Sequence, residues 1–156
     1  MNLFSWKKGV LAALVCSYLG AVPAYAAIIE NQPLNFGTWA ITNNTGIKFI
    51  TVNPDGSFAS SPGVVNILVP PTQGIYRVDS LPPFTAINSV TGTMLAPMSG
   101  GNQDFNLDTF QIIYDPVTNA SGEINITLGV SAKTTGTGVP YDDATYNGTI
   151  QLDINY

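Results

Sequence analysis

The chain has 156 residues, of which 45% are hydrophobic and only 10% are charged, and its formal net charge is −5. It contains no histidine and a single cysteine, so the commonest general base and metal ligand is missing and an intramolecular disulfide is impossible. Ten carboxylates stand against five basic residues, which argues against nucleic acid as a partner because phosphate binding needs a basic surface.

The first 26 residues have the three parts of a cleavable secretory signal. Two lysines precede an apolar run over residues 9–22, which is too short for a bilayer span of about 20 residues. Ala24-Tyr25-Ala26 then offers small residues at the two positions that signal peptidase recognises, which predicts cleavage after Ala26. The alternatives are an uncleaved anchor and a lipoprotein signal at Cys16, although Val15 stands where lipid processing requires a small residue.

Residues 27–156 are predicted to form one exported domain, periplasmic or at the bacterial cell surface, with no stable membrane span. Three basic side chains against ten carboxylates leave this part with a net charge of about −7. No stretch has a helical period of useful length, whereas Gly and Pro recur every eight to twelve residues or so, which is typical of all-β proteins. We therefore expect an all-β fold, an antiparallel β-sandwich of about 8–10 strands.

In chain order, strands are expected between the turn signals. The expected strands are Leu34–Ile41, Ile47–Val52, Gly63–Val69, Gly74–Val78, Phe84–Val90, Met94–Met98, Phe105–Tyr114, Glu123–Ala132 and Tyr146–Tyr156. The turn at Asn53-Pro54-Asp55-Gly56 is the strongest, since proline presets φ and glycine accepts a left-handed backbone. The run over residues 63–69 is dense in β-branched residues, which predicts a strand buried on both sides. Residues 134–143 are expected to form a long polar loop.

The last of these strands alternates perfectly between apolar and polar residues. Its apolar face holds Tyr146, Ile150, Leu152, Ile154 and Tyr156. A slip of one residue would expose every apolar side chain, so the register is strongly specified. Tyr156 is predicted to face inward and anchor the strand. Plain core packing explains this pattern, and so does a strand that is bound by a periplasmic chaperone or completed by a neighbouring subunit through β-augmentation.

No residues combine into an evident catalytic or metal site, and we expect no enzyme activity, cofactor or bound metal. Ser131 and Lys133 lie two residues apart on one strand face, but nothing in the sequence activates either side chain. Acidic and amide residues at every second position over 102–108 faintly resemble a calcium loop. Such a loop needs glycine at its sixth position and glutamate at its twelfth, where this chain has Leu107 and Ile113, so a solvated strand face is the better interpretation.

Three short motifs occur in a familiar order. They are Leu34-Asn35-Phe36-Gly37-Thr38, then Asn53-Pro54-Asp55-Gly56-Ser57, then Tyr146-Asn147-Gly148-Thr149 followed by the terminal Tyr156. Together they resemble the secreted bacterial domain-of-unknown-function family 4402, in which an L-x-F-G strand follows the signal peptide. The C-terminal pattern is also similar to that of chaperone–usher pilins and spore-coat-type pilus subunits. The resemblance implies an immunoglobulin-like or pilin-like sandwich with a structural or adhesive role.

We therefore expect an exported, pilus-subunit-like (fimbrial) protein that acts through β-strand pairing, with identical or related subunits and a periplasmic chaperone as partners. The candidate residues for pairing with a partner strand are Ile28, Leu34, Phe36, Tyr146, Ile150, Leu152, Ile154 and Tyr156. Two departures from pilins matter: no disulfide is possible, and the segment before Leu34 offers only Ile28 and Ile29 for a donor strand. Whether this segment pairs within its own domain or in a neighbour is left open.

The alternative function is a self-complete secreted binding module that recognises a carbohydrate or a host surface. Trp39, Tyr141 and Tyr146 are the aromatic residues that could stack on a sugar, although such residues more often pack in the core or along an edge.

Overall fold

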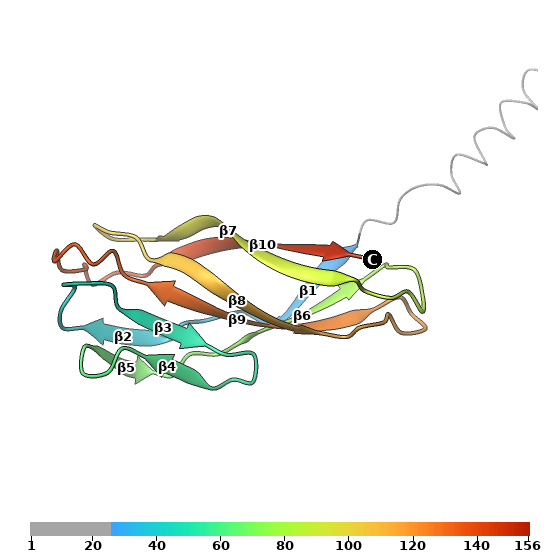
Figure 1. Cartoon of the computed structure of the whole chain (residues 1–156), viewed down its shortest axis with the longest axis horizontal. Coiled ribbons are helices and arrows are strands. Elements are labelled where there is room, and N and C mark those ends of the chain that lie inside the picture. Colours follow the sequence, from blue (N-terminus) through green and yellow to red (C-terminus); the bar gives the residue numbers. More distant parts are fainter. Residues whose placement is uncertain (1–25) are drawn as a thin grey trace, which may run out of the picture.

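The computed structural model describes residues 26–156, which form ten strands and no helix (Figure 1). The strands are β1 (Ala27–Gln32), β2 (Thr38–Ile41), β3 (Phe49–Val52), β4 (Phe58–Ser60), β5 (Val65–Val69), β6 (Gly74–Asp79), β7 (Ser89–Ser99), β8 (Asn106–Tyr114), β9 (Ile124–Lys133) and β10 (Asn147–Asn155). Apart from Ala26, the expected signal segment lies outside the described residues. Within residues 26–156, no helix has the length and apolarity needed to cross a bilayer.

Strand β9 is the centre of the largest sheet. β8 lies antiparallel along one edge of β9, while β6 and β3 share the other edge and pair with residues 124–128 and 130–133. Gly129 lies at the changeover, where a Cβ atom would collide with the backbone oxygen of Val52 and with Pro54. β1 then pairs with β6, and β4 with β3, so the sheet runs β1-β6-β9-β3-β4 with β8 on the far edge of β9.

Two further antiparallel pairs complete the described fold. The long strands β7 and β10 pair with each other, and so do the short strands β2 and β5. A single bridge between Met98 and Phe105 links β7 to the segment that leads into β8. Figure 1 shows β7 and β10 on one side of β8 and β9, with β2 to β5 gathered towards the end of the molecule opposite the C-terminus.

The apolar core follows from the alternation along β9. Its even-numbered side chains are fully buried, because the strand has neighbours on both edges and its apolar face is covered by the other strands. They contribute to two clusters, one near Phe36, Met98, Phe105 and Leu107, the other near Val78, Leu81, Ile87 and Val90. The first cluster lies towards the β2–β5 end, and the second lies where β6 meets the start of β9.

The prediction of an all-β, antiparallel fold is confirmed, and the predicted alternation of Glu123–Ala132 recurs in β9 one residue later. The strand predicted over Leu34–Ile41 is wrong in its first half. Gly37 has a φ of +74° and its backbone N–H donates to the side chain of Asn35, which makes a turn, so the strand begins only at Thr38.

Two other strand predictions need correction. The strand expected over Phe84–Val90 begins only at Ser89, because Phe84 has a φ of 55° and the preceding residues form a loop. The run ending in Leu68 and Val69 is not buried on both sides: both side chains are exposed, because β5 pairs only with β2 at the margin of the molecule. The many β-branched residues correctly predicted a strand at β5, but they could not predict that this strand lies at the margin of the fold.

Candidate functional site

Two of the unpaired strand edges in the described fold, those of β1 and β10, border the same groove. Within the described residues, β1 pairs only with β6, and β10 pairs only with β7. Strands β1-β6-β9-β8 and β7-β10 are thus two separate antiparallel sets, which are joined only by the bridge between Met98 and Phe105, and each set leaves one edge of β1 or of β10 free. The start of β1 and the end of β10 lie at the same end of the molecule, beside the C-terminus (Figure 1).

A groove of about 1300 Å³ lies between these two edges. Its walls come from β1, the residues after it and β2 on one side, and from β10 with the loop before it on the other. The apolar residues that line it include Ile28, Leu34, Phe36, Trp39, Ile41, Leu68, Met98, Phe105, Leu107, Leu128, Ile150 and Leu152. It is the place where the apolar core opens to solvent.

Ile28 shows why the groove is open. It pairs with Val78, and directly opposite residues of paired strands share a face of the sheet. Val78 is fully buried, yet Ile28 is 51% exposed. The inner face of β1 is therefore uncovered because no strand lies beside it.

Aromatic side chains form part of the floor. The ring of Phe105 stacks on Tyr141 at a centroid distance of 4.1 Å, and Trp39 and Tyr146 each lie 4.8 Å from it. Offset and edge-to-face arrangements at these distances stabilise aromatic pairs beyond the area they bury. The four rings come from three separate parts of the chain, since Tyr141 and Tyr146 share the loop before β10, so the floor exists only in the folded protein.

The loop before β10 is held firmly against the groove. The Tyr141 hydroxyl donates to the backbone oxygen of Asp104 at 3.0 Å and accepts from the backbone N–H of Thr135 at 2.9 Å. Gln103 donates to the backbone oxygen of Val139 at 2.6 Å. These contacts pre-form one wall, so that an incoming ligand would not need to order it.

Two tyrosines of the groove have perturbed acidity. Burial raises the pKa of Tyr76, and a hydrogen bond to the backbone of Leu34 partly offsets this effect. Burial also raises the pKa of Tyr146, with the carboxylate of Asp142 acting in the same direction. Both hydroxyls therefore stay neutral at physiological pH and offer hydrogen bonds, not charge.

The structure brings six of the eight predicted pairing residues to this groove: Ile28, Leu34, Phe36, Tyr146, Ile150 and Leu152. Ile154 instead packs, half-buried, against the second core cluster. The prediction that Tyr156 faces inward is wrong. It lies beyond the last paired residue of β10, where no neighbouring strand covers it, and is 50% exposed.

Phe105, Leu107 and Met98 form the floor of the groove, and sequence reasoning did not assign them to a site. Phe105 and Leu107 alternate with the acidic and amide residues of 102–108, but nothing local indicated that Trp39 of β2 and Tyr146 of the loop before β10 would both pack on Phe105. Met98 closes the same region through its bridge to Phe105.

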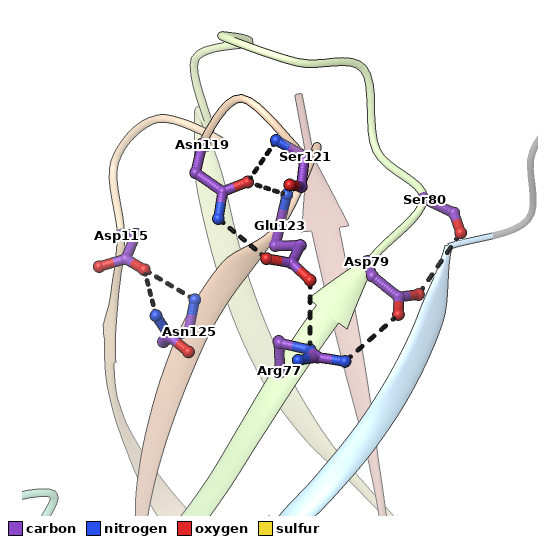
Figure 2. A network of polar contacts seen from close by, with 8 residues as sticks. All are labelled: Arg77, Asp79, Ser80, Asp115, Asn119, Ser121, Glu123 and Asn125. Carbon is purple, nitrogen blue, oxygen red and sulfur yellow. Dashed lines mark hydrogen bonds and ion pairs between the residues drawn. The ribbon is translucent and has the colours of Figure 1, made fainter.

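A polar network stands at the end of the sheet where β6 finishes and β9 begins (Figure 2). The residues drawn are Arg77, Asp79, Ser80, Asp115, Asn119, Ser121, Glu123 and Asn125. Arg77 forms ion pairs with Glu123 at 3.6 Å and Asp79 at 3.8 Å, and Asn119 accepts from the backbone N–H of Glu123. These contacts fasten the connection between β8 and β9 to β6, and they lie on the opposite face of the sheet from the groove.

Ser131 and Lys133, the residues considered as a catalytic pair, contact different partners and not each other. The Ser131 hydroxyl shares a hydrogen bond of 2.6 Å with Thr51, whereas Lys133 forms an ion pair with Asp108. Neither contact prepares Ser131 for nucleophilic attack. Among residues 26–156, no three acidic, histidine or cysteine side chains are grouped so that they could hold a metal ion.

Comparison of the chain with protein-family models, with curated proteins and with solved structures found no match. The resemblance to family 4402 and to pilins therefore stays a prediction made from short motifs.

Proposed function

We propose that the protein is an exported structural or adhesive component of a bacterial surface that takes a β-strand of a partner into the groove between β1 and β10. The observation that carries this proposal is a pair of unpaired strand edges facing each other over an apolar floor. Free N–H and C=O groups along an edge bind an added strand through main-chain hydrogen bonds, and side-chain pockets select its residues.

The order of the strands supports an immunoglobulin-like sandwich that lacks its last strand. In the constant-type fold, strands A, B, E and D form one sheet and strands C, F and G form the other. With β1 and β6 to β10 taken as A to F, β1-β6-β9-β8 has the order A-B-E-D and β7-β10 has the order C-F. Strand G would lie beside β10, at the free edge that borders the groove. Strands β2 to β5 are then an insertion between A and B.

The N-terminal segment supports an acceptor role. Residues 27–32 pair with β6 of the same chain, and Phe36 is buried in the first core cluster. These residues therefore pair and pack within their own domain, and the free edge beside β10 is where a strand from another chain would bind.

Titration with synthetic peptides tests the proposal. Trp39 lines the groove and is the only tryptophan among residues 26–156, so its emission reports occupancy. The exported protein, recovered from a bacterial host, is titrated with nine-residue peptides, the length of β10, in which apolar and polar residues alternate. A blue shift that saturates with the alternating peptide, and is absent with the same composition in scrambled order, is the expected result.

A matched pair of variants locates the binding. Ile28→Asn removes an apolar contact in the groove and should weaken peptide affinity about tenfold. Ile113→Asn changes the same residue type at a 62% exposed position on β8, outside the groove, and should leave affinity unchanged. Equal effects of the two variants, or no response to any peptide, would refute strand acceptance. A glycan that alters Trp39 emission when no peptide does would favour the alternative, a self-complete binding module.

A further inference from the structure

All the charged side chains that line the groove are negative. Three carboxylates border it, those of Glu30 on β1 and of Asp142 and Asp143 in the loop before β10, and no lysine or arginine does. Carboxylates gathered along a cleft with low-dielectric walls focus a negative potential there. An occupant of this groove therefore meets apolar side chains along its floor and negative charge along its rims.

The basic residues of the described chain do not neutralise this charge. Arg77 is paired with Asp79 and Glu123 in the network of Figure 2, and Lys133 is paired with Asp108. The third basic residue, Lys48, does not line the groove. Among the described residues, the three groove carboxylates take part in none of the ion pairs. Their field therefore acts on whatever enters the groove.

The same charge disfavours a second copy of this chain as the occupant. Residues 27–156 carry a net charge of about −7, so two copies repel each other on approach. Complementary charge, in contrast, speeds association and selects among partners.

We propose that the groove accepts a cationic β-strand from a different protein, in which alternate apolar residues fill the floor and Lys or Arg side chains face Glu30, Asp142 and Asp143. This inference rests on the proposed function, because it names the partner chemistry of the same groove. It departs from the expectation that identical subunits pair with one another.

Three peptides that differ only in their flanks test this selection. Each has the same alternating centre, and the flanking residues are Lys, Gln or Glu. The Lys-flanked peptide should bind about tenfold more tightly than the Gln-flanked peptide at low salt, and the Glu-flanked peptide should bind most weakly. The difference should nearly vanish at about 1 M salt, where the screening length falls to about 3 Å.

Charge-neutral variants show where the selection arises. Glu30→Gln and Asp143→Asn should each reduce the preference for Lys over Gln flanks about two- to threefold. Asp153→Asn is the matched control, since Asp153 is an exposed carboxylate on β10 that does not line the groove. It should leave the preference unchanged.

The outcomes separate this inference from the function on which it rests. If none of the peptides binds, the proposed function itself fails. If the three bind equally, or if Asp153→Asn acts like Asp143→Asn, the groove accepts strands but the selection for cationic ones is refuted. Oligomers seen by light scattering that disappear in Ile28→Asn would assign the groove to a second copy and overturn the inference as well.

Discussion

Phe105 joins three distant parts of the chain, and its replacement by alanine tests the packing argument most directly. The side chain is only 3% exposed, and its ring contacts Trp39, Tyr141 and Tyr146 at centroid distances of 4.8, 4.1 and 4.8 Å. Its removal would strip one face from each of these rings and separate the loop before β10 from β2.

The loss in unfolding free energy expected for Phe105→Ala depends on how deeply the ring is buried and on what surrounds it. Replacing a buried Phe by Ala costs about 3–5 kcal/mol, part of which reflects the cavity left behind. Because Phe105 borders the groove, this cavity opens to solvent and its neighbours are free to close on it. We therefore expect the lower end, about 3 kcal/mol of unfolding free energy, or about 10 °C in Tm for a domain of this size.

Urea unfolding of the exported protein measures this cost. Far-UV circular dichroism is the primary signal, since Trp39 emission also changes in the native state when its neighbour is removed. Phe105→Leu keeps most of the apolar volume but not the ring, and should lose about 1–1.5 kcal/mol. Phe84→Ala is the control, since Phe84 is 73% exposed, and should change stability by less than about 0.5 kcal/mol. A loss below about 1 kcal/mol for Phe105→Ala would refute the claim that this cluster holds the groove together.

Four further outcomes are expected from the same unfolding assay. Gly129→Ala should cost at least about 2 kcal/mol, because its Cβ meets the backbone of β3. Thr118→Val should cost about 1–3 kcal/mol, because the buried hydroxyl donates to a backbone oxygen and accepts from a backbone N–H, both at 2.7 Å. The hydrogen bond and ion pair with Lys133 hold the pKa of Asp108 below its ordinary value of 3.8. The Asp108 carboxylate therefore adds at most about 0.5 kcal/mol to the free energy of unfolding, because the site is exposed. This contribution is present at neutral pH and is lost as the pH falls through the folded-state pKa. Deletion of residues 27–36 removes β1 and a buried side chain, so the remainder should lose its cooperative unfolding transition.

Each of these predictions has a control or a contrary outcome. Gly46→Ala is the control for Gly129→Ala: its added Cβ would meet no atom, so it should cost only about 1 kcal/mol from the left-handed backbone. Thr91→Val, at an exposed position of β7, is the control for Thr118→Val and should hardly change stability. The Asp108→Asn variant should have nearly the same free energy of unfolding as the parent protein in acid, and a lower one at neutral pH. The reverse order would contradict the assigned direction of the Asp108 pKa shift. A deletion variant that unfolds cooperatively and remains monomeric would show that β1 is dispensable, and the groove would then lose one of its two walls.

The all-β class and the apolar faces of β9 and β10 could be predicted from local pattern, because side chains of a strand alternate with a period of two whatever the partner strand is. Predictions failed where a residue's environment depends on distant parts of the chain. Leu68 and Val69 have strong strand propensity but lie on a marginal pair, and Tyr156 continues the alternation of β10 beyond the point where any strand covers it.

The candidate site divides in the same way. Ile28, Ile150 and Leu152 were identified as pairing residues because each lies in a terminal segment with apolar side chains, which is a local property. Phe105 and Met98 could not be assigned to the groove, since their role depends on β10 pairing with β7 and on the loop before β10 folding back over Phe105.

By itself, the sequence determined that this protein is built of antiparallel strands and which side of its longest strands is apolar, because both follow from alternation and turn residues. Only the tertiary structure decided which edges stay unpaired, that an apolar groove opens between β1 and β10, and that carboxylates from two separate segments line it. The physical reason is that strand pairing is a contact between residues far apart in the chain, so an unpaired edge is visible only when every other pairing is known.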